Sequence, residues 1–439
     1  MSSLAKPTAL YDALNDKLRI DEFAPAANRV AGGMVVVGGL LAALFALWGH
    51  DRFWVAYLVA FCFLLSISLG ALFFVLIQHL TRAGWSVVVR RVAEAIASNI
   101  WVCAVLFIPL AIGIYQGHLH PQAAGHVVHQ AIERVPVGTT VVDMIGKGDY
   151  LNGPLLPNTA HPVLEHYKEL YLSFPAFMGR MAICFLIWIG LTRFYFSLSK
   201  KQDETKDPAI TSKLQAVSAV GVLLFGGTVS VAGFDLLMAL DPYWYSTMFG
   251  VYFFAGGFLA FFATLNLTLY LMRRKGVAAV AISPEHFHDT GKLMFAFTVF
   301  WAYIGFSQYM LIWYGNMPEE SAWFLIRQTG QWLLVSVILL LGHFIAPFLL
   351  SMSRWPKRRP GLLACLAAYM LVMHFIDLYW LVVPQKSPTG IAPPPLLDFF
   401  LLISLSGVWV FFLVKSLTGV NVIPTGDPRL VESVHFVNQ

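Results

Sequence analysis

Hydrophobic residues dominate ten long runs of the chain, and shorter polar or charged segments separate one run from the next. Each run has about 20 residues or more, the length that a helix needs to cross roughly 30 Å of hydrocarbon. The sequence therefore predicts an all-α integral membrane protein with about ten transmembrane helices. The predicted spans are 30–48, 53–78, 92–116, 172–198, 214–240, 248–272, 290–314, 322–350, 361–383 and 395–417.

The composition excludes an ordinary soluble protein. Of the 439 residues, 58% are hydrophobic and 12% are charged, and the mean hydropathy is +0.69. A soluble domain has about 45–50% apolar and about 25% charged residues. A single soluble domain of this length could not bury so much apolar surface, so lipid is the expected surroundings of the chain.

The number of lysines and arginines alternates between successive connections. The N-terminal segment holds four, the second, fourth, sixth and eighth connections hold three, four, three and four, and the odd-numbered connections hold few. By the positive-inside rule, the tails 1–29 and 419–439 are both predicted to be cytoplasmic. The net charge of +5 follows from this distribution, so it indicates no nucleic-acid partner.

One connection, residues 117–171, is long and is predicted to lie on the outer (periplasmic) side, between spans 1–3 (30–116) and spans 4–10 (172–418). Connections of this length are usually functional. This one holds six of the 13 histidines, but no acidic or cysteine residues at suitable spacing accompany them, which disfavours a metal site. We expect it to form a docking surface for an external partner. The six are His118, His120, His126, His129, His161 and His166.

The cysteines do not indicate a cofactor in this chain. All four lie in apolar runs without CxxC or CxxCH spacing, which argues against iron–sulfur clusters, covalent haem and a disulfide framework. The sequence also has no Walker A segment and no HExxH. If electrons pass through a complex containing this chain, we expect the metals to belong to partner subunits.

Ionisable residues inside the spans are the strongest chemical signal, because charge is costly at membrane depth. Arg180, Asp235, Arg327 and Asp377 are predicted about 8–12 Å below the outer boundary, on four different helices. Two interpretations stay open at this point. The four residues form buried salt bridges that lock helices together, or they form a protonatable relay that opens to the outer side.

Other polar residues extend this pattern through the membrane. His374 and Asp377 are spaced i, i+3, so we expect the carboxylate to hold the imidazole. His343 is predicted about 10 Å from the inner side, at a different depth from His374, which disfavours a haem bound by these two residues. The inner entrance is expected to hold Glu94, His79 and Lys292. Together these residues suggest two half-channels, one from each side.

Four segments resemble the NrfD-like, polysulfide-reductase-type membrane subunits, and within this family those of bacterial alternative complex III. The segments read YLSFPAFMGR at 171–180, DLLMALDPYWYSTMFGVYFFAGG at 235–257, FWAYIGFSQYMLIWYGNMPEESAWF at 300–324 and HFIDLYWLVVP at 374–384. The second and third segments are long enough to be fairly specific. Candidate residues Arg180, Asp235, Asp241, His374 and Asp377 fall inside the four segments.

This resemblance implies a fold of two four-helix bundles plus two extra helices, in the bacterial cytoplasmic (inner) membrane. It implies a respiratory complex that oxidises quinol, such as menaquinol, and passes electrons to cytochrome c or to a terminal oxidase. The implied partners are an iron–sulfur subunit, c-type cytochrome subunits, lipids and a sister NrfD-like subunit that is the better candidate for the quinol pocket. The chain itself is then expected to give structural support, to offer a proton path, to hold no metal and to have no activity alone.

Two other functions stay open. A secondary transporter also suits two bundles with ionisable groups near the midplane, but we find no pair of interrupted spans at matching places in the two halves. A quinone-reactive anchor of a polysulfide or molybdenum reductase would differ mainly in its partners. The aromatic residues that could line a quinone tail are Trp301, Tyr303, Tyr309, Trp313 and Tyr314, of which Trp313 and Tyr314 are better interpreted as an interfacial belt. The mid-span residues Tyr303 and Gln308 are more open.

Overall fold

The computed structural model describes residues 14–46, 50–119, 170–241, 244–386 and 392–437. These residues form helices and connections, with no β-strand among them. Ten of the helices are long and apolar enough to cross a membrane. The prediction of an all-α, multi-pass membrane protein is confirmed.

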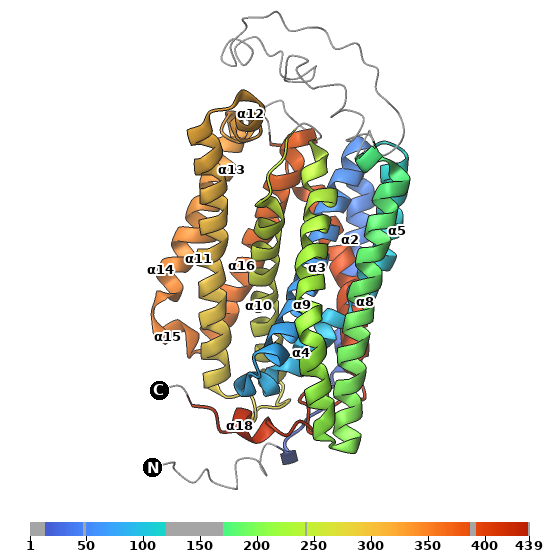
Figure 1. The fold of residues 1–439 in the computed structure, drawn as a ribbon, viewed down its shortest axis with the longest axis vertical. Helices are drawn as coiled ribbons and strands as arrows, with labels where there is room; N and C mark the ends of the chain where they lie inside the picture. The colour runs from blue at the N-terminus through green and yellow to red at the C-terminus, as the bar shows by residue number, and fades with distance from the viewer. Residues whose placement is uncertain (1–13, 47–49, 120–169, 242–243, 387–391, 438–439) are drawn as a thin grey trace, which may run out of the picture.

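The helices follow one another along the chain with few long interruptions (Figure 1). Their bounds are α2 (Ala24–Ala46), α3 (His50–Leu80), η1 (Gly84–Ser86), α4 (Val87–Ser98), α5 (Ile100–Tyr115), α8 (Phe174–Thr205), α9 (Pro208–Leu236), η3 (Met238–Leu240), α10 (Phe249–Arg274), α11 (Pro284–Gly315), α12 (Pro318–Arg327), α13 (Gly330–Ile338), η4 (Leu339–Ile345), α14 (Ala346–Met352), α15 (Arg354–Lys357), α16 (Pro360–Val382), η5 (Val383–Lys386), α17 (Leu396–Leu417) and α18 (Leu430–Val434).

The spans pack as two bundles and an extra pair. The first bundle contains α3, α4 with α5, α8 and α9, and the second contains α10, α11, the α13–η4–α14 span and α16. Helices α3 and α10 contact each other where the bundles meet. The extra pair is α2 with α17, which also packs on α3.

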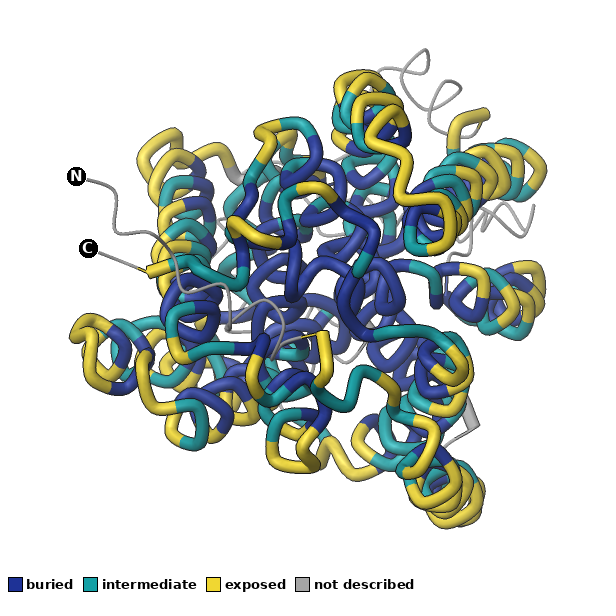
Figure 2. The backbone as a smooth tube through the Cα atoms, turned by 90° about the horizontal axis from the view of Figure 1, so that it is seen from below, coloured by how far each residue is buried: buried dark blue, intermediate teal, exposed yellow. Residues whose placement is uncertain are grey.

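Burial follows this arrangement, as the view along the helices shows (Figure 2). In the most hydrophobic part of α3, 89% of the residues are buried, against 17% in α2. The outer helices keep large apolar side chains exposed, for example Leu186 and Leu223. This is the pattern of a membrane protein, because its outer surface is solvated by lipid and not by water.

Several helices extend beyond their predicted spans, for example α8, which ends at Thr205 and not at 198, and two further differences concern charged residues. The third span was expected to begin at residue 92, but its helix already begins at Val87, and Arg90 and Arg91 lie buried inside it. Carboxylates on other elements neutralise the two arginines, as described below. The eighth span, expected as one helix over 322–350, is broken after Arg327, and a new helix begins at Gly330, whose φ of +55° suits glycine.

The described ends of the chain meet on one side of the molecule, opposite α12 (Figure 1). The N–H of Val422 donates to the carbonyl of Leu18 at 2.8 Å, and the N–H of Ala278 donates to that of Lys17 at 2.7 Å. An even number of spans requires this arrangement. The long connection with its proposed docking role falls almost entirely outside the described residues, which omit 120–169.

Candidate functional site

Asp377 lies on α16 inside the second bundle, and its side chain is bonded by neutral groups. The Tyr252 hydroxyl donates to Oδ1 at 2.6 Å, and the Trp301 indole Nε1 donates to Oδ2 at 3.1 Å. Asp377 is buried. Among the described residues, no ion pair reaches this carboxyl group. It is therefore a buried acid whose charge no bonded cation offsets.

His374 lies one turn from Asp377 on α16, but the predicted pair between them does not form. The His374 Nε2 is 2.9 Å from the Ser66 hydroxyl of α3, while its Nδ1 has no hydrogen-bond partner within the described chain. The oxygens of Asp377 are already bonded to Tyr252 and Trp301. Both side chains flank Gly256, where an added Cβ would lie 3.4 Å from the imidazole and 3.5 Å from the carboxylate.

His343 belongs to the same region, because its ring centroid lies 4.0 Å from that of Trp301. It is fully buried, and neither ring nitrogen has a hydrogen-bond partner in the described structure. It lies in η4, a stretch of π-helix inside the eighth span. Such stretches are frequent at functional sites. The predicted residues His343, His374 and Asp377 are thus brought together.

The outer candidates Arg180 and Asp235 form a bidentate ion pair. Arg180 donates through Nε at 2.8 Å and through Nη2 at 3.1 Å to the two carboxylate oxygens. The guanidinium also lies 3.7 Å from the ring centroid of Tyr171. Partial burial and the nearby Asp235 carboxylate raise the pKa of the Tyr171 hydroxyl to about 12. For these two charges the structure has the geometry of a helix-locking salt bridge.

Arg327 is fully buried and is bonded by backbone oxygens. It donates to the carbonyls of Trp323, Trp380 and Leu381 at 2.8, 3.2 and 2.9 Å. Its guanidinium carbon lies 3.3 Å from the Trp323 ring centroid. Asp241, half-buried after η3, interacts with it electrostatically and accepts a hydrogen bond from the Trp244 N–H at 3.3 Å. The four charges expected at one depth thus form one ion pair and two separate arrangements.

The inner candidate Glu94 lies in a larger network of charges. Its oxygens are 3.6 Å from Arg90, 3.3 Å from Arg91 and 4.0 Å from the His79 imidazole. Arg90 also pairs with Asp427, and Arg91 pairs with Asp203 at 2.9 Å. Lys292, the third residue expected at the inner entrance, pairs with Asp289 at 2.6 Å.

No hydrogen bond between described residues links this inner network to His374. The only bond from His374 reaches Ser66, whose hydroxyl also donates to the Phe63 carbonyl within its own helix. The inner candidate His343 thus lies beside the outer candidates His374 and Asp377, while Glu94 and His79 lie in the charge network described above.

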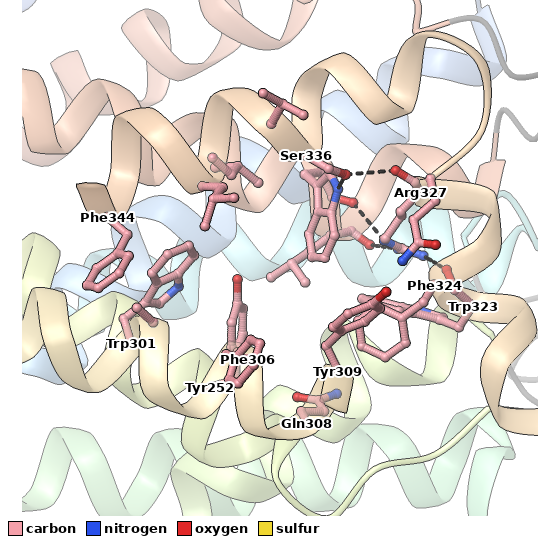
Figure 3. Close-up of a pocket in the computed structure, with 18 of the residues that line it drawn as sticks. Tyr252, Trp301, Phe306, Gln308, Tyr309, Trp323, Phe324, Arg327, Ser336 and Phe344 are labelled. Carbon is pink, nitrogen blue, oxygen red and sulfur yellow. Dashed lines mark hydrogen bonds between the residues drawn. The ribbon is translucent and has the colours of Figure 1, made fainter. Parts of the chain in front are cut away.

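A cavity of about 520 Å³ lies beside Asp377, between α10, α11, α12, α13 and α16 (Figure 3). Tyr252 and Trp301, which bond Asp377, form part of its wall, and Arg327 lies near its other end. Tyr309 and Gln308 also line it, whereas Tyr303 points to the outer surface and is 63% exposed. Of the two residues expected to be more open to a ligand, Gln308 therefore lines this cavity and Tyr303 does not. Trp301 and Tyr309, also named as aromatic candidates, line it as well.

Sequence reasoning missed several residues of these arrangements. Tyr252 and Ser66 carry no special spacing, since their partners come from other helices. Asp398 could have been identified from the sequence, because it is an acidic residue inside the predicted tenth span. It is fully buried and pairs with Arg52, the one basic residue of the first connection.

Comparison with known proteins adds no identification. No protein-family model matches the chain, and no curated protein sequence matches it. Within the described residues, no three His, Cys, Asp or Glu side chains are grouped as a metal site would need.

Proposed function

We propose that this chain is a membrane subunit of a quinol:electron acceptor oxidoreductase and that the side chains around Asp377 take part in proton transfer. The observation that carries the second part is the buried carboxyl group of Asp377, bonded only by Tyr252 and Trp301 among the described residues. A buried acid without a cation can gain or lose a proton at moderate cost, whereas an ion-paired acid holds its charge.

The Asp377 region is the better proton-transfer candidate than the other predicted residues. Asp235 is bound on both oxygens by Arg180, and Glu94 lies within 3.6 Å of two arginines. Close pairing with arginine favours the charged form of a carboxylate. We assign these residues a structural role and Asp377, with His374 and His343, the proton-transfer role.

The proposed partners come from the resemblance of the four segments. They are a sister NrfD-like subunit, an iron–sulfur subunit, c-type cytochromes and a terminal oxidase in the bacterial cytoplasmic membrane. Gentle purification through a tag on this chain tests them by mass spectrometry and an optical spectrum. Co-purifying c-type haem supports the assignment, and a haem-free, solitary chain would contradict it.

The Asp377→Asn variant tests the proton-transfer role in the assembled complex. We expect proton movement to fall by about 100-fold or more, the contribution typical of a positioned proton-transfer group, while complex assembly is retained. The measurement is proton release and quinol oxidation in the same proteoliposomes. Asp235→Asn is the matched control, and we expect it to reduce assembly first. A normal proton yield from assembled Asp377→Asn would overturn the assignment.

Interruptions in two of the spans give partial support to the alternative that the chain is a transporter. Two spans are interrupted: the third is broken at Asn99, between α4 and α5, and the eighth contains the π-helix η4. Transporters with repeats place such interruptions at corresponding positions. Here they fall in the second span of one bundle and the third span of the other, so the correspondence is lacking.

A further inference from the structure

We propose that the short helix α15 and the residues beside it bind a phospholipid with an anionic head group, such as phosphatidylglycerol. This helix joins two spans, one that ends at Met352 and one that begins at Pro360 (Figure 1). It therefore lies at the level of the lipid head groups, on the side of the membrane that is predicted to be cytoplasmic. The proposal concerns binding by this chain alone, so it does not depend on the complex proposed above.

The connection that contains α15 carries four positive charges and no negative one. Residues 353–359 read SRWPKRR. Two carboxylates of α11 lie near it, and each already pairs with a cation: Glu285 with Arg358 at 3.0 Å, and Asp289 with Lys292 at 2.6 Å. Three cations of the connection therefore have no acidic partner among the described residues, and these are Arg354, Lys357 and Arg359.

Lys357 is a buried cation without a counter-charge in the described structure. It is 5% exposed, and it packs against Gly291, where an added Cβ would lie 3.1 Å from its Cγ. Its ammonium has one long hydrogen bond, to the Met352 carbonyl at 3.5 Å, and lies 4.9 Å from the Phe295 ring centroid. Burial and the Lys292 ammonium lower the pKa of Lys357. A phosphate beside this ammonium would offset the cost of burying its charge.

Two exposed arginines lie within three residues of Lys357 along the chain. They are Arg354 and Arg359, and neither guanidinium makes a hydrogen bond or an ion pair with a described residue. The Arg359 guanidinium lies 4.2 Å from the ring centroid of Trp355. Arginine matches the oxygens of a phosphate with two parallel hydrogen bonds. The connection thus offers several donors to one phosphodiester group.

Apolar side chains continue this surface toward the interior of the membrane. Leu349, Leu350 and Met352, in the last turns of the eighth span, are 61%, 60% and 58% exposed. Trp355 is 57% exposed, and tryptophan is typical of the membrane interface. An acyl chain can lie along these side chains while the phosphate contacts the cations. This combination favours a phospholipid over free phosphate or an acidic protein segment, which have no acyl chains.

Topology alone explains why basic residues gather on this side of the membrane, but not why these three lack acidic partners. At the inner end of the first bundle, Arg90 and Arg91 pair with Asp427 and Asp203 on other segments. Basic residues next to a span attract the anionic lipids of the cytoplasmic leaflet. The cations around α15 are available to such a lipid, whereas Arg90 and Arg91 are not.

Native mass spectrometry of the full chain in detergent tests the proposal. The probes are phosphatidylglycerol and phosphatidylcholine with the same acyl chains, titrated separately. We expect phosphatidylglycerol to bind at least about tenfold more tightly, since each basic side chain near the head groups contributes about fivefold. Equal affinities for the two lipids, or displacement of phosphatidylglycerol by inorganic phosphate at equal concentration, would overturn the proposal.

Two double variants locate the binding. Arg354→Gln combined with Arg359→Gln should weaken phosphatidylglycerol binding by about tenfold or more. Lys201→Gln combined with Lys206→Gln removes two exposed charges from the connection between α8 and α9 on the same side, and it should leave the affinity unchanged. An equal loss of affinity in both double variants would show unspecific attraction and would contradict the proposal.

Lys357→Met separates lipid binding from folding. Phosphatidylglycerol should raise the Tm of the unaltered protein more than phosphatidylcholine does, because a ligand of the folded state stabilises it. In Lys357→Met this difference between the two lipids should fall by at least about half, whatever the Tm without added lipid. An undiminished difference would count against the site. If Lys357→Met does not fold, the affinity of the double arginine variant decides.

Discussion

Single residues in the membrane interior satisfy their charges in three different ways. Arg180 and Asp235 pair with each other, Arg327 is bonded by carbonyl oxygens, and Asp377 is bonded by neutral donors. Each arrangement offsets part of the cost of placing charge in a medium of low dielectric constant. Each therefore predicts a different response to mutation.

Arg327→Met tests the carbonyl-bonded arrangement. The variant leaves three backbone carbonyls without their donor, and an unsatisfied buried group costs about 1–3 kcal/mol. We expect the free energy of unfolding to fall by at least about 3 kcal/mol. Thermal unfolding in detergent measures it. Lys292→Met, at a side chain that is 47% exposed, is the control, and an equal Tm for both variants would contradict the prediction.

At the scale of helices, α2 and α17 pack with their backbones in close approach. An added Cβ at Gly38 would lie 2.7 Å from the Ser404 backbone nitrogen, and one at Gly407 would lie 2.6 Å from the Ala31 carbonyl oxygen. Small residues allow such approach between membrane helices, where packing and not water drives association. The α2–α17 pair therefore depends on having no side chain at these positions.

Gly38→Ala and Gly33→Ala form a matched pair within α2. An added Cβ at Gly33 meets no atom within 4 Å, whereas at Gly38 it meets backbone of α17. Alanine favours a helix by about 1 kcal/mol over glycine. We expect Gly33→Ala to leave stability unchanged or raised and Gly38→Ala to lower Tm. The measurement is the Tm of each purified variant. A Gly38→Ala protein as stable as the Gly33→Ala protein would contradict the prediction.

Helix length and hydropathy were readable from the sequence because each span must cross the bilayer alone. The contacts between side chains of different helices could not be read from the sequence, since they depend on how the spans rotate against one another. Thus Asp235 and Asp377 were identified as buried acids, but nothing in the spacing showed that one would pair with Arg180 and the other with Tyr252. The break after Arg327 was missed although residues 327–331 read RQTGQ, because the apolar runs before and after them were joined into one span.

For the whole molecule, the segment after α17 closes the end of the first bundle that is predicted to face the cytoplasm. Asp427 pairs with Arg90, and the Ser433 hydroxyl donates to the Trp85 carbonyl at 2.6 Å and accepts from the Val88 N–H at 3.1 Å. Most of the charged groups under this segment are buried. It thus covers the network around Glu94.

Asp427→Leu tests this closure. Removing one partner of a buried ion pair costs about 3–5 kcal/mol, because the other charge stays buried. We expect the segment 419–437 to become open to protease at the inner face, with the rest of the chain intact. Glu22→Gln, in an exposed pair with Lys17, should change nothing. Resistance equal to that of the unaltered protein would argue against a closing role.

The pairing of Arg90 with Asp427 also sets an order of events during synthesis. Arg90 enters with the third span, but Asp427 is made only after all ten spans. Until then Arg90 has Glu94 as its near partner, and the inner end of the first bundle stays open. The pairing that closes this end can therefore form only after the tenth span has been made, so a chain truncated before Asp427 would leave Arg90 with Glu94 alone of its two carboxylate partners.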